Sequence, residues 1–207
     1  MNCAVFASGG GSNFQALLDR QKAGQLHVEF KLMIGNNSKA AAFERARNHD
    51  IPCLHCAPSH FDTPKQYTER LLQTLKEHDI EMIVLAGYMR MIPPAVVRAF
   101  HHKILNIHPA LLPAFGGKGM YGKKVHQAVI DYGAKVTGVT VHLVDEQYDH
   151  GPVILQDTVR VEDTDDADSL ARRVLAVEHA SYWRAVEAVA RGRVRVEGRR
   201  VIGAVGQ

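Results

Sequence analysis

The clearest chemical signal in the sequence is an asparagine two residues before a histidine, in the segment Asn106-Ile107-His108-Pro109. The run Lys103–Ile107 predicts a strand, and side chains two positions apart in a strand point to the same side, so both polar groups should face one ligand. An amide N–H can stabilise a developing oxyanion and an imidazole can move protons, which together suit acyl transfer. The spacing alone favours a hydrogen-bonded structural histidine over a catalytic one.

Residues 141–152 form a second group of polar side chains, at the end of another predicted strand. His142 lies on that strand, and an acidic stretch that ends at Asp149 follows before a Gly-Pro pair. A carboxylate in this loop could orient a histidine or a water molecule. For Asp145 and Glu146 a solvated turn is the simpler interpretation.

The third group is the glycine-rich turn Ser8-Gly9-Gly10-Gly11-Ser12-Asn13, between a predicted strand, Cys3–Ala7, and a predicted helix, Ser12–Lys22. Glycines let a ligand approach the backbone, and free N–H groups at a helix N-terminus attract phosphate, so the turn favours a phosphate site over a merely tight turn. It matches neither the dinucleotide G-x-G-x-x-G pattern nor a Walker loop. Ser12 with Gln15 three residues later predicts a capping box.

These groups need a scaffold that brings the carboxyl ends of several strands together. Short apolar strands alternate with amphipathic helices, which predicts an α/β, Rossmann-like fold with a mostly parallel twisted sheet and helices on both faces. The continuous apolar run Met82–Ala86 is typical of a central strand. The other expected strands are Cys3–Ala7, Phe30–Ile34, Ile51–Cys56, Lys103–Ile107, Lys135–Asp145 and Pro152–Val161. The expected helices are Ser12–Lys22, Ala40–Asn48, Lys65–His78, a short one that begins near Pro93, Val125–Tyr132 and Ser169–Ala190.

The segment Leu111–Lys124 follows the Asn-x-His pair and is predicted to be a loop. It contains Pro113 and glycines at positions 116, 117, 119 and 122, which give it the backbone freedom of a lid. We therefore expect it to close over the site during turnover.

Composition and charge narrow the class of protein. The chain of 207 residues is 46% apolar and 23% charged, which is ordinary for one globular domain, and no stretch approaches the ~18 apolar residues of a membrane span. The net charge of +3 is concentrated in residues 191–200, where five arginines face only Glu197. Such a cluster is typical of a solvated tail, so we expect no nucleic-acid or membrane partner and C-terminal arginines that are dispensable for chemistry.

The three cysteines, Cys3, Cys53 and Cys56, are odd in number and fit a reducing compartment. With no targeting signal at the N-terminus, the sequence favours a cytoplasmic location. Cys53-Leu54-His55-Cys56 has a C-x-x-C spacing, but no second pair of ligands completes a zinc site. We therefore expect no metal.

Taken together, the motifs resemble the glycinamide ribonucleotide formyltransferase family over nearly the whole chain. The motifs that occur in family order are the Ser8–Asn13 turn, Leu85-Ala86-Gly87-Tyr88-Met89-Arg90, Leu105–Pro113, and Gly138–His142 followed by Asp149–Pro152. The pattern Asn-x-His-Pro-x-Leu-Leu-Pro with a downstream Asp-x-Gly is specific. The resemblance turns the Asn-x-His pair from a structural feature into an expected catalytic centre.

The resemblance implies that Asn106, His108 and Asp149 are the catalytic trio. The residues implied to hold the nucleotide substrate are Gly11, Ser12 and Asn13 at its phosphate, and Gly87, Met89 and Glu178 near its glycinamide end and ribose. The residues implied to hold the folate are Arg90, Ile92, Val144, Asp145, Glu146, Tyr148 and Asp149. Relatives often carry a basic residue at the place of Pro64, and Lys65 is the neighbouring residue that could replace it.

The implied reaction moves the formyl group of 10-formyltetrahydrofolate, a co-substrate, to the amine of glycinamide ribonucleotide. The products are formylglycinamide ribonucleotide and tetrahydrofolate, in purine biosynthesis. We expect a single domain over residues 1–207, with a nucleotide-binding half at 1–100 and a catalytic and folate-binding half at 101–207. The expected protein acts on small molecules as a monomer or homodimer.

Three alternatives remain. A formyltetrahydrofolate hydrolase shares the Asn, His and Asp set, but those relatives usually carry an extra N-terminal regulatory domain. A methionyl-tRNA formyltransferase usually carries an extra C-terminal domain. A non-catalytic nucleotide-binding module would need only the glycine turn.

Overall fold

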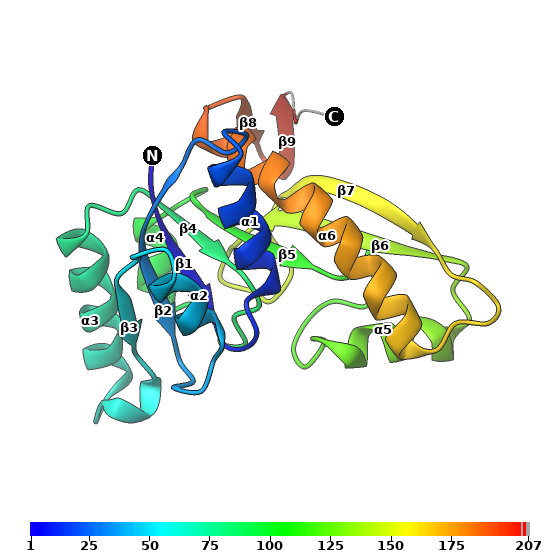
Figure 1. Cartoon of the computed structure of the whole chain (residues 1–207), viewed down its shortest axis with the longest axis horizontal. Coiled ribbons are helices and arrows are strands. Elements are labelled where there is room, and N and C mark those ends of the chain that lie inside the picture. The colour runs from blue at the N-terminus through cyan, green and yellow to red at the C-terminus, as the bar shows by residue number, and fades with distance from the viewer. Residues whose placement is uncertain (204, 206–207) are drawn as a thin grey trace. The chain divides into compact units, whose positions relative to one another are not determined.

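The computed structural model describes residues 1–203 and 205, and its main element is a seven-stranded sheet with the order β3-β2-β1-β4-β5-β6-β7 (Figure 1). Its strands are β1 Asn2–Ala7, β2 Glu29–Gly35, β3 Cys53–His55, β4 Met82–Leu85, β5 Ile104–His108, β6 Val136–Leu143 and β7 Val153–Arg160. The helices are α1 Ser12–Lys22, α2 Ala42–Arg47, the short 3₁₀ helix η1 Pro58–His60, α3 Pro64–Glu77, α4 Pro94–Ala99, α5 Lys123–Tyr132 and α6 Ala167–Ala190. The predicted α/β class with a mostly parallel sheet is confirmed, and the ends of the predicted elements shift by no more than two residues.

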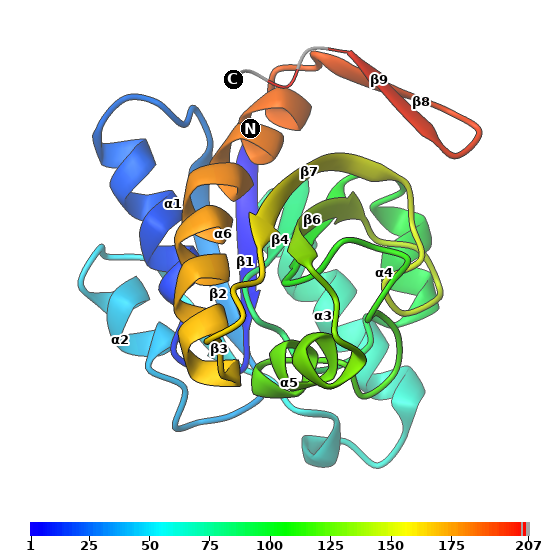
Figure 2. The same ribbon diagram turned by 90° about the vertical axis from the view of Figure 1, so that its right-hand side faces the viewer.

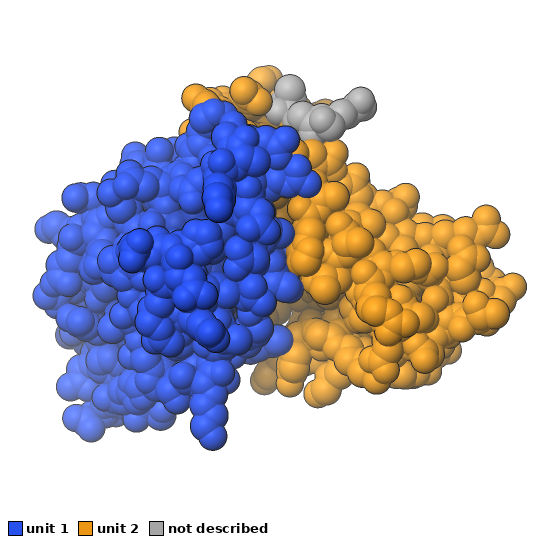
Figure 3. All heavy atoms as spheres, viewed as in Figure 1, with its two compact units in different colours: residues 1–105 blue, residues 106–207 orange. Residues whose placement is uncertain are grey.

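The chain divides into two compact units, residues 1–105 and 106–207, which Figure 3 colours separately. The boundary falls inside β5, five residues beyond the boundary at residue 100 expected between the two halves. The roles expected for the two halves of a single domain stay predictions.

In the first unit, β1 pairs in parallel with both β2 and β4, and β2 pairs in parallel with β3. From Cys3 onward every side chain of β1 is buried, as are all four of β4, which is why these strands read as continuous apolar runs. The register pairs Phe6 with Leu85 and Ala7 with Gly35, so the three strands end at the same edge of the sheet. The loops that follow β1, β2 and β4 therefore begin side by side.

The start of α1 differs from the prediction. Gly11, not Ser12, is the N-cap, with a left-handed φ of 68°, and no side chain caps the helix. The amide of Gln15 donates to the Gly11 carbonyl (2.9 Å), while the Gln15 side chain donates to Asp19 (2.9 Å). The predicted Ser12–Gln15 capping box is thus wrong, because the left-handed glycine turns the chain so sharply that Ser12 is already the first helical residue.

In the second unit, β6 and β7 pair antiparallel, with an irregularity between Val141 and His142. The long helix α6 contacts β6, β7 and α5. Its N-cap is Asp166, whose carboxylate accepts the Ser169 amide at 2.7 Å, so the helix begins two residues before the predicted start. Among the described residues, no helix combines the length and hydrophobicity that crossing a bilayer requires.

The C-terminal arginine-rich stretch is a β-hairpin, not the predicted solvated tail (Figure 2). Strands β8 Val194–Glu197 and β9 Arg200–Gly203 pair antiparallel, and β9 also contacts β7. The composition hid an alternation in which the valines of β8 are half-buried and its polar residues are exposed. Residues 204, 206 and 207 of the stretch lie outside the described residues.

Candidate active site

The second unit brings the three predicted catalytic residues together. Asn106 and His108 lie in the last three residues of strand β5, and Asp149 lies in the loop between β6 and β7. His108 Nδ1 is 3.6 Å from Asp149 Oδ2, and the two side chains are only 4% and 12% exposed. A buried imidazole beside a buried carboxylate is the arrangement that proton transfer in a protected site requires.

A second histidine, His142, completes this arrangement. Its Nδ1 is 2.9 Å from the Leu143 carbonyl and therefore carries a proton, which leaves Nε2 to accept the Asn106 amide at 3.1 Å in the neutral ring. The same Nε2 lies 3.7 Å from Asp149 Oδ1. In the sequence His142 stands beside the acidic loop, but no pattern there indicates a role for it. In the structure its Nε2 lies between the Asn106 amide and the Asp149 carboxylate.

The backbone fixes the direction of the Asp149 carboxylate. Asp149 has a left-handed φ of 50°, and its Oδ2 accepts the Gly117 amide at 2.9 Å. Two residues later, a Cβ on Gly151 would lie 1.8 Å from the Leu143 carbonyl oxygen, so only glycine allows the loop to close on β6 here. Strained backbone of this kind is found where a side chain must be held in one direction.

Each ring nitrogen of His108 faces an oxygen atom. Nδ1 faces Asp149, and Nε2 is 2.9 Å from the carbonyl of Phe115, in the predicted lid loop. Because a carbonyl can only accept, Nε2 carries the proton of the neutral ring. Phe115 itself has a left-handed φ of 54°. The Phe115 carbonyl thus occupies the place where a ligand could accept the Nε2 proton.

Burial and nearby charges shift the pKa values of this pair. Burial lowers the pKa of His108 below its ordinary value, as does His142, while Asp149 and the Phe115 carbonyl partly oppose the shift. Burial alone would raise the pKa of Asp149, but His142, His108 and the Gly117 amide together bring it below its ordinary value. The resting site therefore holds a neutral imidazole beside an ionised carboxylate.

In the first unit, the glycine turn at the end of β1 is held by Arg45 of α2. Its Nε donates to the Gly10 carbonyl at 2.8 Å, and a terminal nitrogen donates to Gln15 at 3.1 Å. A Cβ on Gly11 would lie 2.8 Å from Ala42 Cβ, so glycine is needed for space as well as for its positive φ. Arg45 places a positive charge beside the predicted phosphate site, and no local sequence pattern indicates this contact because Arg45 lies 35 residues after Gly10.

Ser8 joins the loops that follow β1, β2 and β4. Its hydroxyl donates to Asn36 (2.5 Å) and accepts the Met89 amide (2.8 Å), and its own amide donates to the Gly87 carbonyl (3.1 Å). Two of the predicted nucleotide-binding residues, Gly87 and Met89, are therefore tied to the start of the glycine turn. Met89 is also one of the few exposed large apolar side chains.

The remaining predicted residues divide between the two units. Arg90 is exposed, whereas Ile92 is buried, with only 3% of the residue exposed. Val144, Asp145, Glu146 and Tyr148 form the partly open β6–β7 loop, and Glu178 is buried on α6. Lys65 Nζ lies 3.7 Å from Glu69 on its own helix.

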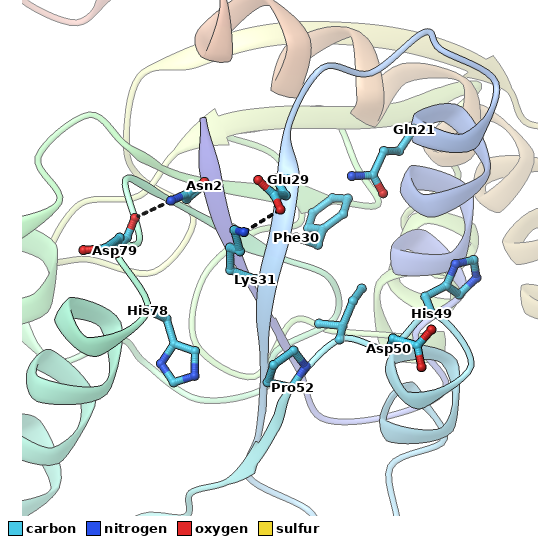
Figure 4. A pocket seen from close by; sticks show the side chains of 11 residues that line it. Asn2, Gln21, Glu29, Phe30, Lys31, His49, Asp50, Pro52, His78 and Asp79 are labelled. Carbon is cyan, nitrogen blue, oxygen red and sulfur yellow. Dashed lines mark hydrogen bonds and ion pairs between the residues drawn. The ribbon is translucent and has the colours of Figure 1, made fainter.

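A cavity of about 620 Å³ lies in the first unit, at the edge of the sheet where β1 and β2 begin and not at the edge where the glycine turn follows β1 (Figure 4). It is lined by the beginnings of strands β1 and β2 and includes none of the predicted site residues. Its polar groups bind one another, as Lys31 with Glu29 (2.5 Å) and the Asn2 amide with the Asp79 carbonyl (3.1 Å) show. We assign this cavity no role in the reaction.

The cysteines are free thiols. Burial raises the pKa of Cys3 to about 12, and burial also raises the pKa values of Cys53 and Cys56, so none is activated as a thiolate. Within residues 1–203 and 205, no three His, Cys, Asp or Glu side chains gather closely enough to hold a metal ion.

This combination of fold and site has matches among known proteins. The profile of the family described as "Formyl transferase" matches residues 1–186. The chain therefore belongs to the formyl transferase family.

Particular relatives narrow the comparison. The chain is 45% identical over 192 residues to "Phosphoribosylglycinamide formyltransferase, chloroplastic" of Vigna unguiculata, covering 92% of this chain but only 61% of that longer protein. It is 37% identical over 179 residues to phosphoribosylglycinamide formyltransferase of Bacillus subtilis, covering 86% of this chain and 89% of the relative. The crystal structure of glycinamide ribonucleotide transformylase 1 from Symbiobacterium toebii superposes with a TM-score of 0.92 at 37% identity, covering 98% and 93% of the two chains.

Proposed function

We propose that this chain transfers the formyl group of 10-formyltetrahydrofolate to the amine of glycinamide ribonucleotide, a step of purine biosynthesis. The observation that carries the proposal is the largely buried cluster Asn106–His142–Asp149–His108, which places an amide, two imidazoles and a carboxylate together. The named relatives support the choice of substrates.

In this proposal the neutral amine attacks the formyl carbon, and a new C–N bond gives a tetrahedral intermediate with a negative oxygen. Protonated His108 and the Asn106 amide stabilise that oxygen, and Asp149 stabilises the imidazolium. The intermediate then collapses as the bond to N10 of the folate breaks. The proton that the amine loses replaces the formyl group on N10, carried by His108, Asp149 or an intervening water.

The contact between His108 and Phe115 sets a requirement for this mechanism. In the structure the Phe115 carbonyl accepts the Nε2 proton, so that carbonyl must move before Nε2–H can bind an oxyanion. The glycine-rich loop Leu111–Lys124 has the backbone freedom for such a movement. The negative charge of the intermediate would also raise the pKa of His108, which burial holds low in the resting site.

The proposal gives each group of predicted binding residues a part of a substrate. Gly11, Ser12, Asn13 and Arg45 would hold the phosphate, while Gly87, Met89 and Glu178 would lie near the ribose and the amine. Arg90, Ile92 and the Val144–Asp149 loop would hold the pterin. The N–H groups at the start of α1 and the guanidinium of Arg45 suit a dianion. The reaction as proposed needs no metal, and the cytoplasmic location and the monomer or homodimer stay predictions.

A formyltetrahydrofolate hydrolase is the alternative, because the same trio could direct water at the formyl carbon. The glycine turn argues for a phosphorylated acceptor, since water needs no phosphate site. Incubating the purified chain with 10-formyltetrahydrofolate, with and without glycinamide ribonucleotide, separates the two. We expect tetrahydrofolate to form only when the acceptor is present. A His108→Asn variant should lose this activity. Equal rates with and without acceptor would overturn the proposal in favour of the hydrolase.

A further inference from the structure

The C-terminal hairpin contributes one side chain to the loop that carries Asp149. Arg199 lies in the turn between β8 and β9, and its guanidinium donates to the His150 carbonyl at 2.5 Å. Its other terminal nitrogen is 3.2 Å from Nε2 of the His150 ring. Arg199 is therefore bound to both the backbone and the side chain of the residue next to Asp149.

The contact continues across the loop through His150. Its Nδ1 is 2.6 Å from Asp145 Oδ2, and Asp145 Oδ1 accepts the Gln147 amide at 2.9 Å. One terminal nitrogen of the Arg199 guanidinium lies close to both ring nitrogens of His150, 3.5 Å from Nδ1 and 3.2 Å from Nε2, so the side-chain contact is a close approach of the guanidinium to the ring. Arg199, His150 and Asp145 thus connect the two ends of the β6–β7 loop.

This connection bears directly on the backbone of Asp149. The residue has a left-handed φ of 50°, a conformation that aspartate adopts more readily than most residues but that the contacts on either side of it must still favour. On its C-terminal side Arg199 fixes the His150 carbonyl, and Gly151 packs against the Leu143 carbonyl. The His150 carbonyl belongs to the peptide that joins residues 150 and 151, so a turn of this part of the loop would displace the adjacent Asp149, whose carboxylate lies 3.6 Å from His108 Nδ1.

We propose that Arg199 is a positioning residue that holds Asp149 in the direction the reaction needs. The inference rests on the proposed function for its kinetic effect and on the contacts above for its structural effect. The family profile ends at residue 186, so the hairpin and Arg199 lie beyond the part of the chain that it matches. The expectation of dispensable C-terminal arginines therefore changes for this one residue.

The kinetic test compares Arg199→Ala and Arg199→Lys with Arg200→Ala, a matched control that removes the same charge one residue later. Side chains of His150 and Asp145 are 44% and 33% exposed, so we expect a modest loss in kcat for Arg199→Ala, about three- to tenfold. KM for the nucleotide should stay unchanged. Arg199→Lys should recover part of the loss, and Arg200→Ala should behave as wild type.

Combination with Asp149→Asn tests whether Arg199 acts through Asp149. In that background Arg199→Ala should cost no further activity, because the group being positioned is already lost. An additive loss, or an unchanged kcat in Arg199→Ala, would overturn the proposal.

Hydrogen exchange gives a readout that does not depend on formyl transfer. Amides 145–151 should exchange faster in Arg199→Ala, while Arg200→Ala should match wild type. Unchanged exchange in Arg199→Ala would overturn the anchoring. Faster exchange in a chain that transfers no formyl group would support the anchoring and overturn the proposed function alone.

Discussion

The proposed phosphate site and the proposed catalytic site are built in different ways. At the glycine turn, the groups offered to a ligand are backbone N–H groups and the half-buried Ser12, and the side chains of Ser8 and Arg45 hold the backbone in shape. At the catalytic site, the working groups are side chains, buried among one another on β5, β6 and the loop before β7. Backbone donors suit binding of a fixed charge, whereas buried titratable side chains suit a charge that appears during the reaction.

The difference has an energetic consequence. A phosphate carries its charge before, during and after the reaction, so contacts to it stabilise the bound substrate and the transition state equally. The oxyanion exists only near the transition state, so contacts to it change kcat. Substitutions in the two regions should therefore separate into effects on KM and effects on kcat.

The largest expected effect is at His108. Replacing it by Asn keeps a polar side chain but removes the proton carrier and the cationic donor, so kcat should fall by about 10²–10³ with both KM values little changed. Steady-state kinetics with each substrate varied in turn measures the split. Asp149→Asn should show a similar loss, since an amide cannot supply the charge that stabilises an imidazolium.

The double variant tests whether the two residues act together. If His108 and Asp149 form one unit, the combined loss should be much smaller than the product of the single losses. A matched control is Asp131→Asn, an exposed carboxylate on α5 that accepts a hydrogen bond from Gln127. Near-normal kcat in either single variant, with both substrates saturating, would make that residue structural only.

The second effect is on the nucleotide. Ser12→Ala removes one hydrogen bond to a charged phosphate, so KM for glycinamide ribonucleotide should rise about tenfold while KM for the folate stays the same. Ser38→Ala, at an exposed serine in the loop after β2, is the matched control. Equal weakening of both substrates would contradict the division between the two regions. Gly11 is a poor site for this test, because any Cβ there meets Ala42 and the positive φ disfavours it.

The sequence predicts contiguous motifs better than contacts between distant residues. The glycine turn and the Asn-x-His pair are each contiguous, so residue types and the predicted strand ends are enough to locate them. Asn106 and His142 are 36 residues apart, and Arg199 and His150 are 49 apart, so their contacts depend on how strands and the hairpin pack. Local patterns carry no record of such contacts, and for the same reason the charge of residues 191–200 was taken for a solvated tail.

The capping box shows a limit of a different kind. Ser12 and Gln15 fit the pattern, but the pattern does not record that Gly11 can take a left-handed φ at the N-cap. Once Gly11 turns the chain, Ser12 lies inside the helix and its amide joins those available to an anion. The wrong local prediction therefore leaves the phosphate prediction intact.

A third prediction concerns the pKa of His108. The Asp149 carboxylate is one of the groups that raise this pKa against the lowering effect of burial, so Asp149→Asn should lower it further. An NMR titration of the His108 ring in the two proteins measures the difference, with Asp131→Asn as the control. A raised or unchanged value would show that the carboxylate does not act on the ring.

The same shift fixes the sign of one contribution to stability. The pKa of His108 is lower in the folded than in the unfolded chain. As the pH falls below 6.5, a larger fraction of the unfolded chain than of the folded chain is therefore protonated at this residue. The contribution of His108 to the free energy of unfolding should therefore be lost as pH falls below that value. The loss should be larger in Asp149→Asn, where the opposing carboxylate is gone, and urea unfolding at a series of pH values measures it.

The smallest expected effect is a difference in protection by ligands, and it compares the two regions within one molecule. A non-reactive folate analogue should slow hydrogen exchange of the Val144–Asp149 loop more than that of the Gly9–Asn13 turn, because the pterin is assigned to the loop. Glycinamide ribonucleotide alone should give the opposite order, since its phosphate meets the backbone amides of the turn. Both ligands are measured on the same peptides, so each serves as the control for the other. Protection of the turn by the folate analogue alone would mean that the two pockets are assigned the wrong way round. Protection of both regions by both ligands would mean that binding in one region orders the other. Substitutions in either region would then change both KM and kcat.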